Sequence, residues 1–209
     1  MKKIFFCFLT FCMVFAVGAR EFTVDSFEAH PSNLTTNTHE AVDLGLSVKW
    51  ATCNVGASKP SDYGNYYAWG ETETKSTYTE INSVTYGKSM KDIGGTQYDV
   101  AHTEWGGSWR LPTKAECQEL INKCKWQWTS VDGHAGYKVT GPNGNSIFLA
   151  AAGGRDGDSA LSVGSGGGYW SSAPDSGDYA AWELYFDVGL QDVYWYGRYY
   201  GKSVRPVVE

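Results

Sequence analysis

Positive charge is scarce in this sequence. Its 209 residues include 17 Lys and Arg against 23 Asp and Glu, giving a formal net charge of −6 at pH 7. Proteins that bind nucleic acids normally carry a basic patch or stripe, so we exclude that class. Charged residues make up only 19% of the chain and aromatic residues 15%, a balance that disordered segments do not have. We therefore expect a folded globular protein.

The sequence also lacks an apolar run long enough to span a membrane as a helix. Its longest run is Ile4–Val17, whereas a spanning helix needs about 20 residues. Two lysines precede this run, and the small residues Gly18 and Ala19 follow it, as in a secretory signal peptide. We predict that residues 1–19 are a signal peptide cleaved after Ala19, which leaves no stable membrane span. A lipoprotein signal ending at Cys12 is the alternative.

Motifs for metal binding and catalysis are missing too. The four His are scattered and no Cys-x-x-Cys occurs, so we expect no zinc site. The sequence has neither the Gly-x-Ser-x-Gly of serine hydrolases nor a phosphate-binding loop. Asp156 and Asp158 in a glycine-rich turn leave calcium open, although such acids are more often solvated turn residues. We predict a protein that is not an enzyme and holds no cofactor.

What remains after residue 19 divides into a polar segment and one domain. Residues 20–40 are rich in Thr and Asn and predict a linker or a short edge strand. Residues 41–209 have the length of one domain. Its first part, Val42 to Trp50, alternates between apolar and polar residues, which is typical of a half-buried strand or a hairpin.

Two helices are predicted in the middle of the domain. Thr113 and Glu116 form a capping box, and the apolar residues that follow keep helical spacing as far as Cys124. A shorter helix is expected to begin after Asp99, as its cap, and to end near Trp105 before two glycines.

The rest of the domain favours short strands. Residues 137–140 and 147–150 flank a turn signal, and the glycine-rich stretch 151–168 predicts loops. Alternation in 182–188 and in 193–198 predicts two strands that meet around Gly189 to Asp192. Few helices and many short strands predict an α+β domain with a large β share.

Tryptophans within the apolar alternation, or next to the helix cap, are expected in the core. These are Trp50, Trp109, Trp170 and Trp182. Trp126 and Trp128 fit either the core or its rim.

Three cysteines follow the predicted signal peptide, so one is expected to stay unpaired. Cys117 and Cys124 are seven helical residues apart, a rise of about 10.5 Å, and a disulfide tolerates only about 7 Å between Cα atoms. We favour a disulfide between Cys53 and Cys124. A bond between Cys53 and Cys117, or three free thiols, remain open.

Six sequence blocks follow one another along the domain: Val42–Gly56, Tyr67–Glu71, Trp109–Glu116, Tyr137–Gly144, Tyr169–Ser172 and Ser203–Pro206. In this order they resemble the Fibrobacter succinogenes major paralogous domain over about residues 41–208. The resemblance implies a C-type-lectin-like fold in a secreted or cell-surface protein of a bacterium. The biochemical function of that family is largely unassigned.

Two activities found on related folds are not supported. Trp109–Glu116 is similar to a block of formylglycine-generating enzymes, but those enzymes use a late pair of cysteines, and no cysteine follows Cys124. The sequence also lacks the Glu-Pro-Asn, Gln-Pro-Asp and Trp-Asn-Asp motifs with which sugar-binding C-type lectins hold calcium.

Tyrosine is concentrated in the C-terminal part of the domain, opposite the apolar alternation or in adjoining loops. Tyr-rich surfaces recognise ligands because the ring offers a large contact area, a hydroxyl and a low entropy cost on ordering. We predict a surface for an extracellular glycan or protein, built by Tyr179, Glu183, Tyr185, Asp192, Tyr194, Tyr196, Arg198, Tyr199 and Tyr200. Packing on sheet edges is the alternative for these tyrosines.

Two further interpretations remain. The domain is a structural or adhesive subunit of a surface assembly in one of them. In the other it is a variable binding protein, because the stretch from Tyr169 to Arg205 resembles the variable region of retroelement-diversified lectin-fold proteins.

Overall fold

The computed structural model describes residues 39–209. The predicted signal peptide, the alternative lipoprotein signal and nearly all of the predicted linker lie outside these described residues. Within residues 39–209, no helix is both long and apolar enough to cross a membrane.

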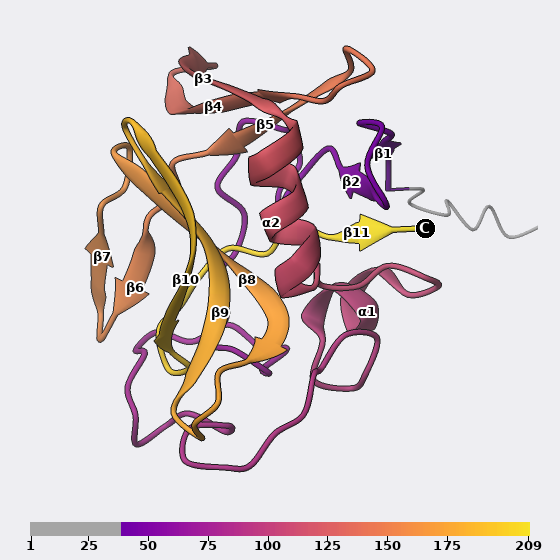
Figure 1. The fold of residues 1–209 in the computed structure, drawn as a ribbon. Coiled ribbons are helices and arrows are strands. Elements are labelled where there is room, and N and C mark those ends of the chain that lie inside the picture. The colour runs from indigo at the N-terminus through magenta and orange to yellow at the C-terminus, as the bar shows by residue number, and fades with distance from the viewer. Residues whose placement is uncertain (1–38) are drawn as a thin grey trace, which may run out of the picture. The chain divides into compact units, whose positions relative to one another are not determined.

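Short antiparallel strands are the main regular secondary structure of the described chain (Figure 1). The first sheet has the order β1-β2-β11, with β1 (Ala41–Val42), β2 (Lys49–Ala51) and β11 (Val207–Val208). The second consists of β3 (Lys125–Val131), β4 (His134–Thr140) and β5 (Ser146–Ala150). A third has the order β10-β9-β8, with β8 (Gly166–Pro174), β9 (Ala180–Asp187) and β10 (Leu190–Gly197). A hairpin pairs β6 (Gly154–Asp156) with β7 (Ser159–Leu161).

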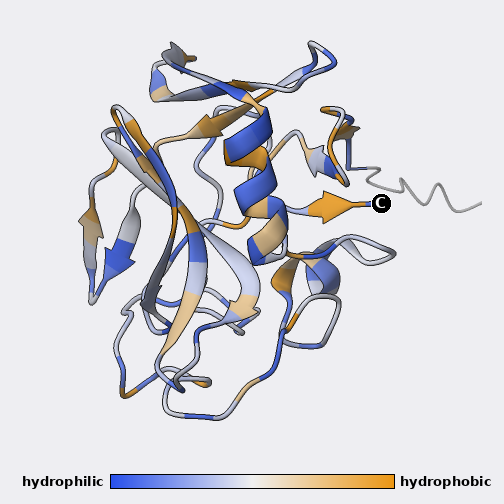
Figure 2. Ribbon diagram, viewed as in Figure 1, coloured by the Kyte–Doolittle hydropathy of each residue, from blue (hydrophilic) through white to orange (hydrophobic). Residues whose placement is uncertain are grey.

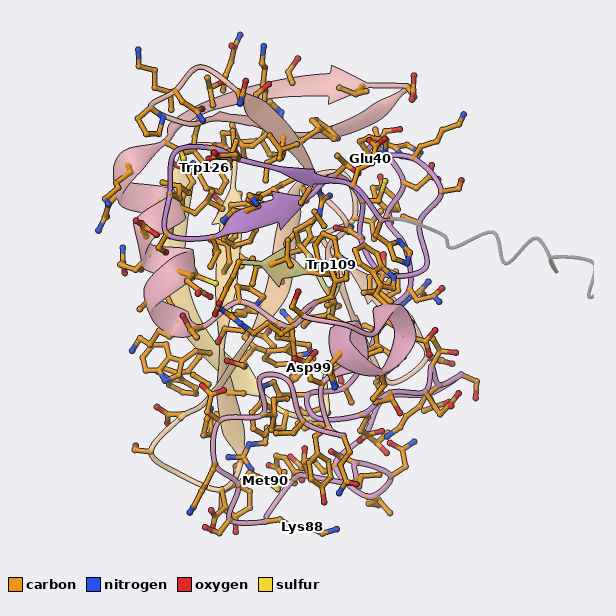
Figure 3. All side chains as sticks on the ribbon, turned by 90° about the vertical axis from the view of Figure 1, so that its right-hand side faces the viewer. Glu40, Lys88, Met90, Asp99, Trp109 and Trp126 are labelled. Atoms are coloured by element: carbon orange, nitrogen blue, oxygen red, sulfur yellow. The ribbon has the colours of Figure 1, made fainter. Side chains whose placement is uncertain are left out.

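Two short helices complete the fold, so the predicted α+β class with a large β share is confirmed. Helix α2 (Lys114–Lys123) begins with the predicted capping box between Thr113 and Glu116. Helix α1 (Val100–Trp105) begins after Asp99, whose buried carboxylate accepts from the Ala101 and His102 N–H groups. Figure 3 shows Asp99 near α1 and Trp109 beside the last strand.

Most of the strand predictions are confirmed, with two exceptions. Val42 to Trp50 form a hairpin in which β1 pairs with β2, and β9 pairs with β10 as predicted, although their turn is at Val188 and Gly189 and residues 190–192 already belong to β10. The prediction of loops in 151–168 is wrong in part, because this stretch contains β6, β7 and the start of β8. Glycines occur there because backbones and buried side chains approach them closely: a Cβ on Gly153 would lie 2.0 Å from the Leu161 carbonyl oxygen. Strand β3 was not predicted.

Helix α2 covers one face of the β8–β9–β10 sheet, hereafter the inner face. Cys117 and Leu120 of α2 are buried against Leu184, Phe186 and other apolar side chains of the sheet. Figure 2 shows hydrophobic and hydrophilic residues alternating along α2, as expected for a helix with one buried side.

A second core holds the long irregular segment 52–98. Trp69 and Trp170 are almost wholly buried there, and their indole N–H groups donate to the carbonyls of Ser171 at 2.9 Å and Tyr67 at 2.8 Å. Arg198 lies beneath this segment with no exposure, and its guanidinium donates to four backbone carbonyls, those of Thr85, Lys88, Gly177 and Ala180. These bonds tie residues far apart in the sequence to the end of β10.

The predicted tryptophan core is right for Trp50 and Trp170, which are both 1% exposed. Trp109 and Trp182 are only half-buried: Trp109 meets the Trp105 ring edge-on, and the Lys114 ammonium lies over the Trp182 ring. Trp126 and Trp128 pack against the core without being fully buried.

The predicted disulfide is not formed, and Cys53, Cys117 and Cys124 are all free thiols. Cys53 lines a cavity with His39 and Trp105, whereas Cys124 ends α2 and packs on the apolar core. The two side chains therefore have different neighbours. Burial raises the pKa of the Cys124 thiol to about 11, so it stays protonated at neutral pH.

Candidate functional site

The face of the β8–β9–β10 sheet that points away from α2, hereafter the outer face, carries the polar half of the alternation. Register fixes its composition, since Tyr194 of β10 lies opposite Glu183 of β9, and Asp192 lies opposite Tyr185. Successive side chains of a strand point to opposite faces, so the same strands place Leu184 and Phe186 under α2. Figure 1 shows α2 on one side of this sheet and the β6–β7 hairpin on the other.

A pocket of about 470 Å³ lies on the outer face, between the sheet and the β6–β7 hairpin. This volume is typical of small-molecule sites, which span about 300 to 1,000 Å³. Six of the nine residues predicted for the binding surface line it: Glu183, Tyr185, Asp192, Tyr194, Tyr196 and Tyr200. Arg155 of the hairpin and Lys202, which follows β10, line it too, and sequence reasoning missed both.

Glycines of β8 leave the room for this pocket. Gly168 pairs with Tyr185 on the outer face, and a Cβ there would lie 2.7 Å from Glu183 Oε2 and 2.9 Å from Lys202 Nζ. Its neighbour Gly167 serves the inner face, where a Cβ would lie 2.5 Å from the Phe186 ring. Both glycines are therefore required by close approach, one for the core and one for the site.

A buried ion pair forms the floor of the pocket. Lys202 Nζ lies 3.0 Å from Glu183 Oε2 and donates to Glu183 Oε1 at 3.2 Å. The Glu183 side chain is not exposed at all, and that of Lys202 is 8% exposed. Glu183 Oε2 lies within ion-pair distance of the ammonium but has no hydrogen-bond partner among residues 39–209.

Burial and charge act in opposite directions on Glu183. Burial raises the pKa of its carboxyl because the charged form loses hydration, and the Lys202 ammonium offsets part of that rise. A buried ion with one unmade hydrogen bond is uncommon in a folded protein, since such groups normally find a partner. The floor thus holds an acceptor that a bound group can satisfy.

Lys202 is held in place by its backbone and by an aromatic ring. Its N–H and C=O form a two-bond bridge with Tyr67, at 3.0 and 2.9 Å. Its ammonium lies 3.9 Å from the centre of the Tyr196 ring, a cation–π contact. The two contacts direct the ammonium toward the pocket floor and the Glu183 carboxylate.

Tyrosine rings form the wall and rim of the pocket. Tyr194 is 48% exposed, while Tyr196 and Tyr200 meet edge to face with ring centres 4.5 Å apart. Burial is the main cause that raises the pKa of Tyr185 and of Tyr196, so both phenols stay protonated at neutral pH and can donate as well as accept.

Three predicted residues lie outside the pocket lining. Arg198 belongs to the second core and is not exposed, so the prediction that it lies on the binding surface was wrong. Its guanidinium N–H groups donate to backbone carbonyls instead. Tyr199 stacks on Tyr200 at 4.3 Å, and Tyr86 links Tyr199 to Tyr179 through edge contacts of 5.4 and 5.0 Å. Tyr179 is 59% exposed, so this row of rings continues from the rim over the neighbouring loop.

The two acids considered for calcium lie in the β6–β7 hairpin, and both Asp156 and Asp158 are exposed. Among the described residues, no group of three or more His, Cys, Asp or Glu is arranged to hold a metal ion.

Comparison with protein-family models, curated proteins and solved structures finds no match to this chain.

Proposed function

We propose that this protein is an exported or cell-surface binding module that recognises its ligand, a glycan or a protein segment, in the outer-face pocket without catalysis. The observation that carries this proposal is the meeting of tyrosine rings and a buried ion pair around one preformed hollow. Ligand sites combine an apolar, ring-lined wall with a few fixed polar groups in this way. The signal-like N-terminal sequence supports export.

The finer fold assignment is part of the same proposal. We infer a C-type-lectin-like domain of the Fibrobacter succinogenes major paralogous type. The six ordered sequence blocks support it, together with an α+β architecture of short antiparallel strands and two short helices.

Two adjacent residues of β10 give the test a matched pair. Tyr194 and Trp195 are 48% and 50% exposed and their rings stack with centres 5.6 Å apart, but only Tyr194 lines the pocket. The full chain, Tyr194→Ala and Trp195→Ala would be screened on a glycan array and against a displayed peptide library. We expect at least tenfold weaker binding for Tyr194→Ala, about 1.4 kcal/mol, and a much smaller loss for Trp195→Ala, which removes the ring stacked on Tyr194 but keeps Tyr194 itself.

Equal binding by both variants, or no binder from either library, would contradict the proposal. Chemical conversion of a bound glycan would contradict its non-catalytic part. Loss of binding in Trp195→Ala alone would favour the structural or adhesive interpretation, which gains support from the exposure of Trp195 and of Val188, which is 65% exposed.

A further inference from the structure

The floor of the pocket offers one donor and one acceptor side by side. Lys202 carries three N–H donors, and Glu183 Oε1 accepts one of them. Glu183 Oε2 lies 3.0 Å from the same ammonium but makes no hydrogen bond among residues 39–209. A ligand group that both donates and accepts a hydrogen bond satisfies both side chains at once, and a hydroxyl is such a group.

Charge around the pocket favours a neutral ligand. Its charged lining residues are Arg155 and Lys202 against Glu183 and Asp192, so the two signs balance. A cationic ligand would meet the Lys202 ammonium, and an anionic ligand would meet the Glu183 carboxylate. Like charges that meet in a buried place cost several kcal/mol, which works against both classes.

Ring geometry adds an apolar wall next to the polar floor. Tyr185, Tyr194 and Tyr196 all project from the outer face into the pocket lining. A sugar ring has an apolar face that packs on an aromatic ring and a rim of hydroxyls that donate and accept. Small apolar ligands have no hydroxyls to bond with the polar floor, and charged ligands do not match the balanced charge of the pocket.

Gly168 leaves space beside the Glu183 carboxylate. Gly168 brings no side chain over Glu183 Oε2, and a Cβ there would lie 2.7 Å from this oxygen and 2.9 Å from Lys202 Nζ. A ligand reaches Oε2 only if the Lys202 side chain rotates, because Lys202 Nζ lies 3.0 Å from that oxygen.

We infer that the pocket binds a neutral saccharide, one hydroxyl of which donates to Glu183 and accepts from Lys202. This inference rests on the proposed function and narrows it to one ligand class held without calcium. It also assigns Lys202, which sequence reasoning missed, to ligand binding.

The first arm of the test leaves the protein unchanged. The full chain is screened on an array of neutral, uronic-acid, sialic-acid and amino-sugar glycans, with and without a chelator. Monodeoxy derivatives of the strongest neutral glycan are then titrated by calorimetry. We expect neutral glycans alone to bind, with chelator making no difference, and one deoxy position to weaken binding about ten- to a hundredfold.

The second arm removes the pair but keeps the fold. Replacing both members of a buried ion pair by apolar residues is often neutral for stability, whereas removing one member leaves a buried charge unpaired. The double variant Glu183→Leu/Lys202→Met is therefore expected to melt near the wild-type temperature and to bind the same glycan at least a hundredfold more weakly.

The outcomes separate this inference from the proposed function. Preference for acidic or amino sugars, loss of binding with chelator, no sensitivity to any deoxy position, or full binding by the double variant would each overturn the inference. Binding of peptides in place of glycans, weakened by Tyr194→Ala, would overturn the saccharide but keep the pocket as the binding site. If neither glycans nor peptides bind, both the saccharide inference and the proposed function are overturned.

Discussion

The two faces of the β8–β9–β10 sheet are built by the same three strands and differ in almost every physical respect. On the inner face, Leu184 and Phe186 have no exposure and pack under α2. On the outer face, their neighbours Glu183 and Tyr185 border a pocket of about 470 Å³. A period of two in the sequence thus separates a filled core from a hollow site within one strand.

The difference between the faces is the reason why we place the proposed binding site on the outer one. Core side chains pack closely and leave little room, although the Trp50 indole N–H there also lacks a hydrogen-bond partner. The outer face keeps both room and an unpartnered carboxylate oxygen, Glu183 Oε2. A helix packed on one face holds the strands of the sheet in place. The other face can therefore carry a buried ion pair next to a pocket without loss of the sheet.

The sharpest way to break this comparison is to add one methyl group to each face in turn. Gly167→Ala would press a Cβ to within 2.5 Å of the buried Phe186 ring, which cannot move away, so we expect a loss of about 1–3 kcal/mol. Gly168→Ala would press on Glu183 Oε2 and Lys202 Nζ, which can shift. It should lose less stability and more ligand affinity.

Urea unfolding and ligand titration of both variants check this expectation. Equal stability losses with equal affinity would show that the two faces are not distinct in function. If Gly168→Ala binds the ligand as tightly as the wild type, the Glu183–Lys202 ion pair does not take part in ligand binding.

A smaller effect concerns the helix that covers the inner face. Burial tends to raise the pKa of Glu116, but two hydrogen bonds to Arg110, at 2.9 and 2.7 Å, and one from the Thr113 N–H hold it below its usual range. Because the pKa of Glu116 is lower in the folded state, its charge stabilises the fold at pH values above its unfolded pKa of about 4.3. This stabilisation is lost as the pH falls through the lower pKa of the folded state.

Glu116→Gln is therefore expected to lose about 1–2 kcal/mol of stability at pH 7 and progressively less below about pH 4. Thermal or urea unfolding from pH 3 to pH 7 measures this, with exposed Glu104→Gln as the control. Ligand affinity at pH 7 should stay at the wild-type level, because the pocket lies on the other face. A stability difference that does not change with pH would contradict the role of the Glu116 charge.

Local signals in the sequence predicted the elements that local physics determines. The capping box at Thr113 predicted the start of α2, and alternation predicted which residues of β9 and β10 share a face. Four residues that this alternation placed on one face, Glu183, Tyr185, Tyr194 and Tyr196, line the outer-face pocket. The turn between β9 and β10 followed from Gly189, which has a φ of +94°.

What the sequence did not predict depends on contacts between distant segments. Lys202 belongs to no recognisable sequence motif. It lies 19 positions after Glu183 in the sequence, and only the fold places the two side chains in contact. Arg198 alternates with apolar residues like a surface side chain, yet carbonyls from two distant loops enclose it. Glycines 166 to 168 have the composition of a flexible loop, yet they begin strand β8. Glycine is needed at 167 and 168 because the side chains of Phe186 and Glu183 lie where a Cβ would be.

The most direct test of the central claim is a crystal structure of the full chain with a bound neutral glycan. The account predicts a sugar in the outer-face pocket, with one hydroxyl oxygen within hydrogen-bond distance of both Glu183 Oε2 and Lys202 Nζ. A sugar bound elsewhere on the molecule, or a sugar in the pocket with only a water molecule on the Glu183–Lys202 pair, would contradict it.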